Sequence, residues 1–180
     1  MGRHSRRATS FRLLYVCTGN ICRSPFAEIL TRHLLVGRLG GRAAAEFDVS
    51  SAGVRAVVGA QMHPDTRDEL TPWGLDGVIA GRFAARQLRS TMIEEADLVL
   101  GANPRHRSAV VERAPVALQT TFGLREFARL AAAVDPGVLP VDDPVERDRG
   151  TTSPAPDAGK ATVGGRGTSP SEVTDNARCN

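Results

Sequence analysis

Short apolar segments of strand-like composition alternate along this chain with segments of helical periodicity. The clearest strand is Phe11–Val16 (F-R-L-L-Y-V), because it is short, apolar and partly aromatic. Such alternation predicts an α/β fold, here a three-layer doubly wound arrangement around a four-stranded parallel sheet. The other predicted strands are Phe47–Ser50, Asp97–Leu100 and Val116–Leu118.

The helices are predicted from apolar spacing and from residues that start or stop a helix. The first begins at Pro25, a residue type that suits a first helical turn, and ends near Leu35 because Gly37 and two further glycines follow. Thr91 with Glu94 offers a capping box for a short helix. The remaining predicted helices are Asp65–Leu70, Pro104–Arg113 and Leu124–Ala133.

The 180 residues suit one domain, although apolar residues are unevenly distributed. Hydrophobic residues make up 41% and charged residues 24%, which excludes a wholly disordered chain. Large apolar residues become rare after Leu139, and the end of the chain is rich in Gly, Ser, Thr and Pro. We therefore expect a basic, flexible tail at 1–10, a folded domain at 11–150 and a disordered tail at 151–180.

Charge and cysteine content indicate which kinds of partner the protein binds and in which cellular compartment it lies. The net charge is only +3 and the arginines are spread along the chain, so we expect no nucleic-acid partner. Three cysteines are too few, and odd in number, for a secreted disulfide framework. Because no apolar run approaches membrane-spanning length, we expect a cytoplasmic protein with no membrane association.

The segment from Cys17 to Pro25, C-T-G-N-I-C-R-S-P, lies between the first predicted strand and the first predicted helix. Ligands bind at the carboxyl ends of parallel strands. The start of a helix adds unpaired N–H groups and the positive end of the helix dipole. Gly19 and Asn20 can adopt left-handed conformations that direct more N–H groups at one point. The segment therefore predicts an anion cradle of the size of a phosphate.

Two side chains of this segment add chemistry to the cradle. The guanidinium group of Arg23 is a planar fork suited to two-point contact with phosphate. At the rim of such a cradle, Cys17 is expected to be a thiolate. A thiolate nucleophile beside a bound phosphate predicts covalent phosphoryl transfer.

A cysteine and an arginine separated by five residues form the signature of cysteine-dependent phosphatases. The full string near the N-terminus resembles that of the low-molecular-weight protein tyrosine phosphatase family. Further similar segments are S-A-G at residues 51–53, R-Q-L at 86–88 and E-A-D-L-V-L at 95–100. The resemblance extends over residues 11–144.

The resemblance implies a role for each residue of the segment. Cys17 is the expected nucleophile, which forms a phosphocysteine, and Arg23 is expected to hold the phosphoryl oxygens. Asn20 is expected to brace the loop, and Ser24 to stabilise the thiolate or simply to cap the helix. The residues expected to bind the substrate are Thr18, Gly19, Asn20, Ile21, Cys22 and Ser24.

Cys22 has two interpretations. By the resemblance, it pairs reversibly with Cys17 and protects the nucleophile from over-oxidation. Alternatively, it is a small buried packing residue.

The leaving group needs a general acid, which the family supplies from an Asp-Pro-aromatic loop towards the C-terminus. The chain has two Asp-Pro pairs there, at Asp135 and Asp143, and Asp143 fits the later, catalytic position. Val145 stands where the family has an aromatic residue, and the polar tail stands where the family has its final helix. Asp143 is the predicted acid, and the alternative is that Asp143, like Asp142 and Asp135, is an ordinary loop residue.

No spacing of His and Cys suits a zinc site, and we expect neither a metal nor another cofactor. His33 and His106 fall on predicted helices, and we expect both on the surface.

Four functions fit the resemblance. The first is hydrolysis of phosphotyrosine in proteins, with a bacterial tyrosine kinase as the opposing enzyme. The second is hydrolysis of phosphoarginine, for which relatives commonly have Thr at the position of Ile21; an apolar Ile21 favours an aryl ring. The third is reduction of arsenate. An arsenate reductase needs resolving cysteines, and none lies between Cys22 and Cys179. The fourth is a pseudophosphatase that binds phosphate-bearing partners with little turnover.

Overall fold

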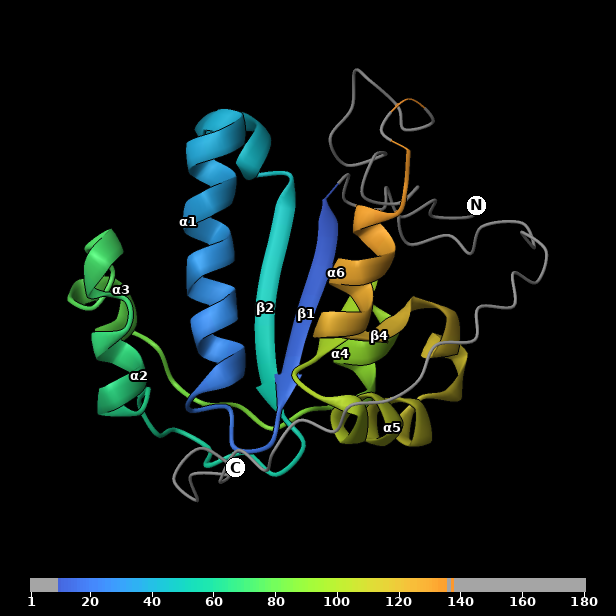
Figure 1. The fold of residues 1–180 in the computed structure, drawn as a ribbon. Helices are drawn as coiled ribbons and strands as arrows, with labels where there is room; N and C mark the ends of the chain where they lie inside the picture. The colour runs from blue at the N-terminus through green and yellow to red at the C-terminus, as the bar shows by residue number, and fades with distance from the viewer. Residues whose placement is uncertain (1–9, 136, 138–180) are drawn as a thin grey trace, which may run out of the picture.

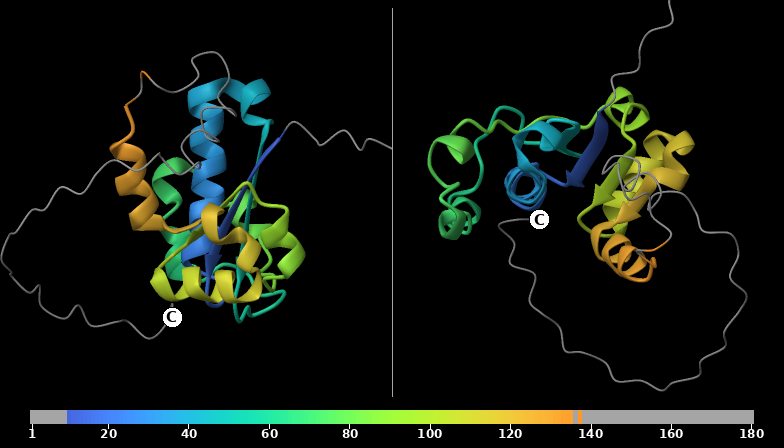
Figure 2. Two further views of the ribbon diagram at one scale, coloured as in Figure 1. Left: turned by 90° about the vertical axis from the view of Figure 1, so that its right-hand side faces the viewer. Right: turned by 90° about the horizontal axis from the view of Figure 1, so that it is seen from above.

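The computed structural model describes residues 10–135 and 137, which form a parallel β-sheet with helices on both faces (Figures 1 and 2). The sheet contains four strands in the order β2-β1-β3-β4. The strands are β1 (Phe11–Cys17), β2 (Phe47–Gly53), β3 (Leu98–Gly101) and β4 (Thr121–Gly123). All neighbouring strands are parallel, so the predicted α/β, three-layer doubly wound fold is confirmed.

The side chains of β1 divide between two hydrophobic layers because successive residues of a strand face opposite sides of the sheet. Leu14 and Val16 pack with Ile93 and Val110 of helices α4 (Ser90–Glu94) and α5 (Pro104–Arg113). Leu13 and Tyr15 join a cluster that includes residues of α1 (Arg23–Ala44) and α6 (Leu124–Ala132) on the other face. β1 is therefore buried in the middle of the sheet, and the loop that follows it lies at the carboxyl edge of the sheet (Figure 1).

A third hydrophobic cluster fixes smaller helices against α1. It joins Ile29 of α1 to Met62, Leu70 and Ala80, with partial burial of Phe83. The elements of this region are α2 (Pro64–Asp68), the 3₁₀ helix η1 (Thr71–Trp73) and α3 (Val78–Gly81). In Figure 1, α2 and α3 stand beside α1, away from α6.

The first helix is longer than predicted. It continues through Gly37 to Ala44, with a kink at Gly40, where φ is +76°. A helical glycine costs only about 1 kcal/mol relative to alanine, so Gly37 weakens the helix without ending it. Only at Gly40 does the backbone leave the helical region.

The fourth predicted strand was misplaced. Val116–Leu118 belongs to the 3₁₀ helix η2 (Pro115–Thr120), and β4 follows at Thr121. Pro115 fixes φ and lacks an N–H group, which suits the first turn of a helix, and a three-residue apolar run cannot distinguish the two structures.

Several boundaries shift, and one predicted cap is absent. The helix predicted at Asp65–Leu70 is Pro64–Asp68. The helix near Thr91 begins one residue earlier, at Ser90, and Arg89 precedes it without a side-chain cap, so the predicted capping box does not form. Helix Pro104–Arg113 is confirmed at both ends.

The predicted tails at 1–10 and 151–180 fall, apart from residue 10, outside the described residues and stay predictions. Within residues 10–135, no helix has the length and apolar character required to cross a bilayer.

Candidate active site

The loop that joins β1 to α1 lies at the carboxyl end of a central strand. β1 ends at Cys17 and α1 begins at Arg23, as the sequence predicts for a cradle between a strand and a helix. Asn20 has a φ of 55° and is the one non-glycine residue with positive φ in the described part of the chain. Asparagine tolerates this left-handed conformation better than most residues, which lets the loop turn tightly.

The segment after β2 holds the loop by its carbonyl groups. The carbonyls of Cys17, Thr18 and Gly19 accept hydrogen bonds from the N–H groups of Val54 (2.9 Å), Arg55 (3.0 Å) and Val57 (3.0 Å), respectively. These bonds hold the carbonyl groups on the side of the loop that faces the segment after β2. The N–H groups of the loop can then point to the opposite side, where an anion would bind.

Gly53 explains the S-A-G segment at the end of β2. A Cβ atom at this position would lie 2.5 Å from the carbonyl oxygen of Thr18 and 3.0 Å from the nitrogen of Asn20. No real Cβ fits at 2.5 Å from a backbone oxygen, so only glycine lets β2 approach the loop this closely.

The thiol of Cys17 is free and the residue is only 2% exposed. Its Sγ lies 2.9 Å from Oγ of Ser24. Because Ser24 Oγ already accepts a hydrogen bond from Nδ2 of Asn20 (2.9 Å), the Ser24 proton is available to the sulfur. The Ser24 hydroxyl is therefore placed to donate to the sulfur of Cys17.

Every polar atom of the Asn20 side chain is hydrogen-bonded, and the residue is fully buried. Nδ2 donates to both Ser24 Oγ and Ser51 Oγ (2.9 Å each), and Oδ1 accepts from the N–H of Arg86 (2.8 Å). Asn20 thus ties the loop to β2 and to the segment before α4. These contacts are those expected of a residue that braces the loop.

The hydrogen bonds continue from Ser51 into α1. Ser51 Oγ donates to Oε2 of the buried Glu28 (2.6 Å), and Oε1 of Glu28 pairs with Arg32 (3.2 Å). An unbroken chain of polar contacts therefore runs from the Cys17 thiol to a carboxylate behind the loop.

His106 approaches the loop from α5 and is buried, with 3% exposure. Its Nδ1 accepts a hydrogen bond from the N–H of Asn103 (3.2 Å), so the ring proton is on Nε2. Nε2 then donates to Oγ1 of Thr18, 3.0 Å away. The predicted surface position of His106 was wrong, because helix spacing alone does not show what packs against α5.

Apolar side chains line the outer wall of the loop. Ile21 and Val57 come within 3.4 and 3.8 Å, respectively, of the position that a Cβ on Gly19 would take. Val57 is half exposed, at 52%, and Ile21 is partly exposed, so both offer apolar surface to a ligand at the loop.

The geometry agrees with the comparisons to known proteins. A family model described as low molecular weight phosphotyrosine protein phosphatase matches residues 12–153. The chain belongs to this family. A protein-arginine-phosphatase from Geobacillus stearothermophilus is 33% identical over 65% of this chain and 71% of its own length. A probable low molecular weight protein-tyrosine-phosphatase, EpsP, from Ralstonia nicotianae is 32% identical over 67% of this chain and 75% of its own.

A solved structure shows the same fold. The YwlE arginine phosphatase from Geobacillus stearothermophilus has a TM-score of 0.56 and 32% identity, with 79% of this chain and 83% of that chain covered. The phosphatase family therefore includes relatives named for two different phosphorylated residues.

The phosphatase loop gathers every predicted site residue from Cys17 to Ser24. Asp143 and Asp142 lie outside the described residues, so the general acid stays a prediction. Asp135 is described and exposed, and its Oδ1 accepts from the N–H of Gly137 (2.9 Å). Cys22, the last loop residue before α1, is buried. Because Cys17 is a free thiol here, reversible pairing of the two cysteines also stays a prediction.

Sequence reasoning missed Ser51, Glu28, Arg86 and His106 as parts of this phosphatase site. For Glu28 the sequence offered one signal, an acidic residue on the apolar side of α1. A buried carboxylate needs polar partners, so its position indicates that such partners lie nearby. The others are 31 to 88 residues away in sequence from the loop residues that they contact.

The buried His106 predicts a specific dependence of stability on pH. Burial, and the positive charge of Arg23, lower the pKa of His106 from 6.5 to about 4. Between these values the unfolded chain binds a proton that the folded chain does not, so stability falls as the pH drops below about 6.5. Each pH unit in this window is worth up to about 1.4 kcal/mol.

Urea unfolding at pH 7 and pH 5 tests this expectation. We expect wild type to lose about 2 kcal/mol more than His106→Gln, whose amide can still donate to Thr18 but does not titrate. The same pH dependence in both proteins would show that His106 does not carry the effect.

Proposed function

We propose that this protein is a protein tyrosine phosphatase that hydrolyses phosphotyrosine through a phosphocysteine intermediate. The observation that carries the proposal is the Cys17 thiol at the base of the loop, 2.9 Å from the Ser24 hydroxyl, with Arg23 at the start of α1. A nucleophile that is already hydrogen-bonded in a preformed cradle has little reorganisation to undergo before reaction.

In the first step, the Cys17 thiolate attacks phosphorus and an S–P bond forms as the O–P bond to tyrosine breaks. The leaving phenolate takes a proton from the Asp143 carboxylic acid, in the role implied by the family. Arg23 and the loop N–H groups hold the three phosphoryl oxygens, whose charge they stabilise as the bonds exchange.

In the second step, water attacks phosphorus and gives a proton to the Asp143 carboxylate. The S–P bond breaks, inorganic phosphate leaves, and the Cys17 thiolate is restored. The same aspartate thus acts first as an acid, when it gives its proton to the leaving group, and then as a base, when it takes a proton from water.

Ile21 favours phosphotyrosine over phosphoarginine as the substrate. With Val57, it makes the wall of the loop apolar, which suits an aryl ring better than a charged guanidinium group. The proposed substrates are therefore phosphotyrosyl proteins, and the proposed opposing enzyme is a bacterial tyrosine kinase. The low cysteine content supports a cytoplasmic location.

Substrate preference is tested by comparing phosphotyrosine and phosphoarginine peptides. We expect wild type to prefer phosphotyrosine, and Ile21→Thr to shift the ratio of kcat/KM values toward phosphoarginine by about tenfold, roughly the effect of one apolar contact. Val57→Thr serves as a matched change on the same wall. A wild-type preference for phosphoarginine would overturn the proposed substrate while leaving the phosphocysteine chemistry intact.

The general acid is tested by Asp143→Ala, with Asp135→Ala as the matched control from the other Asp-Pro pair. We expect Asp143→Ala to lower kcat on phosphotyrosine by about 10²–10⁴-fold. The loss is expected to be smaller on para-nitrophenyl phosphate, whose leaving group needs no proton. A loss in the Asp135 variant instead, or in neither, would show that Asp143 is not the acid.

A further inference from the structure

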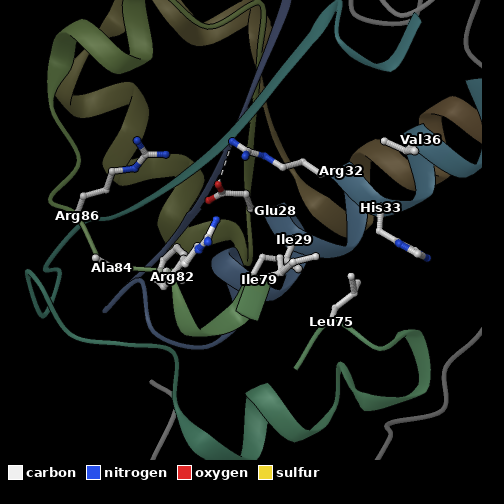
Figure 3. Close-up of a pocket in the computed structure, with 11 residues that line it drawn as sticks. Glu28, Ile29, Arg32, His33, Val36, Leu75, Ile79, Arg82, Ala84 and Arg86 are labelled. Carbon is white, nitrogen blue, oxygen red and sulfur yellow. Dashed lines mark ion pairs between the residues drawn. The ribbon is translucent and has the colours of Figure 1, made fainter. Parts of the chain in front are cut away.

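A cleft of about 810 Å³ runs along α1 on the side away from α6. Its walls come from α1, from α3 and from the segment between α3 and α4, and its lining does not include the Cys17–Arg23 loop. This volume lies in the range of pockets that hold small organic molecules. Figure 3 shows the side chains that line it.

One part of this cleft is strongly basic. Arg32, Arg82 and Arg86 all line it, against one carboxylate, that of Glu28. Figure 3 shows the three guanidinium groups drawn around the Glu28 carboxylate. The lining thus carries a surplus of two positive charges, which attracts anions to this part of the cleft.

The three arginines differ in how many hydrogen bonds and ion pairs their guanidinium groups already make. Arg32 pairs with Glu28 and donates to the carbonyl of Val49. Among the residues that the structure describes, the Arg86 guanidinium is hydrogen-bonded through Nε alone, which donates to the carbonyl of Ser51 at 2.7 Å. Within the described residues, the Arg82 guanidinium has no hydrogen bond or ion pair. Arg82 and the amino groups of Arg86 can therefore bind an incoming anion.

The other part of the cleft is apolar. Ile29 and Leu75 form its buried floor, while Ile79 and Val36 are more than half exposed at its edge. In Figure 3, Ile29, Ile79 and Leu75 lie on the opposite side of the cleft from Arg86. An apolar floor beside guanidinium groups with N–H groups available for hydrogen bonding is complementary to a molecule with an apolar body and an anionic head.

Two residues of the cleft also contact the brace behind the catalytic loop. Glu28 accepts from Ser51 (2.6 Å), which in turn accepts from Asn20 (2.9 Å). The N–H of Arg86 donates directly to Asn20 Oδ1 (2.8 Å). An anion that binds to Arg32 or Arg86 therefore contacts residues that one or two hydrogen bonds connect to the loop.

We propose that this cleft is a second ligand site, which binds a small organic anion with an apolar body and a phosphate, sulfonate or carboxylate head, and that binding there alters turnover through Asn20. The site itself stands on the cleft alone, whereas the effect on turnover rests on the proposed phosphatase activity.

Anilinonaphthalene sulfonate has the required apolar body and anionic head, cannot be hydrolysed as a phosphate ester, and fluoresces when its rings are buried. Its binding is titrated by fluorescence to wild type, Cys17→Ser, Arg82→Ala and Arg23→Lys. Arg38→Ala, an exposed arginine elsewhere on α1, is the matched control. We expect saturable binding at one site, weakened about tenfold by Arg82→Ala and unchanged in the other variants. A second variant, Ile79→Asp, is expected to weaken binding by removing apolar surface at the edge of the cleft.

Kinetics with para-nitrophenyl phosphate test the effect on the loop. Saturating probe is expected to lower wild-type kcat by about fivefold, with the same midpoint as the fluorescence titration and little change in KM. Arg82→Ala is expected to match wild type without the probe and to respond only at about tenfold higher probe concentration.

The site is overturned if binding is absent, is unaffected by Arg82→Ala, or is weakened equally by Arg38→Ala. Purely competitive inhibition would show that the probe occupies the catalytic loop and would also overturn the proposal. An inactive wild type that still binds the probe through Arg82 would remove the proposed phosphatase function but retain the site.

Discussion

Cys17→Ser is expected to abolish turnover of para-nitrophenyl phosphate while leaving the fold and the phosphate loop intact. The substitution exchanges one atom in a residue that is 2% exposed, so packing changes little. A serine hydroxyl, unlike a thiol, stays protonated beside Ser24 and is a much poorer nucleophile at neutral pH. Loss of an enzyme's nucleophile typically lowers kcat by about 10⁴-fold or more.

Two measurements separate loss of chemistry from loss of structure in this variant. Thermal unfolding is expected to match that of wild type, and inorganic phosphate is expected to raise the melting temperature of both proteins, because the loop and Arg23 remain. Equal turnover by wild type and Cys17→Ser would overturn the phosphocysteine route. If both are inert but both bind phosphate, the protein is a phosphate-binding pseudophosphatase, the last of the four functions considered above.

Arg23→Lys is expected to lower turnover strongly, although it keeps the positive charge. A lysine ammonium is a point charge, whereas the guanidinium group presents a flat fork that can contact two phosphoryl oxygens at once. That geometry matters most when charge spreads over the phosphoryl oxygens during bond exchange. We expect kcat to fall by about 10²–10³-fold, with a smaller change in KM.

The matched control for this prediction is Arg38→Lys, on the exposed surface of α1. It is expected to leave both kinetic constants unchanged. If Arg23→Lys raised KM and left kcat alone, Arg23 would bind the ground state only, and its proposed role in the transition state would be wrong.

The elements predicted most accurately are those with strong local signals at both ends. Helix Pro104–Arg113 begins after Asn103, whose side chain accepts from the N–H of His106, and both a cap and an N-terminal proline can be seen in the sequence. The predicted end of α1 was wrong because a glycine costs a helix only about 1 kcal/mol, so Gly37, which is exposed, does not end it. Val116–Leu118 was wrong because three apolar residues carry no period that separates strand from 3₁₀ helix.

The sequence by itself determined the chemistry of this phosphatase loop. The proposed nucleophile, the arginine, the turn-forming residues and the start of the helix are contiguous between Cys17 and Pro25. Their proposed roles therefore depend on local backbone geometry that neighbouring residues set. Only the tertiary structure decided what holds the loop in place. Asn20 meets Ser51 across 31 residues, and Thr18 meets His106 across 88. Such partners are chosen by which strands and helices pack together, and packing leaves no pattern in either local segment.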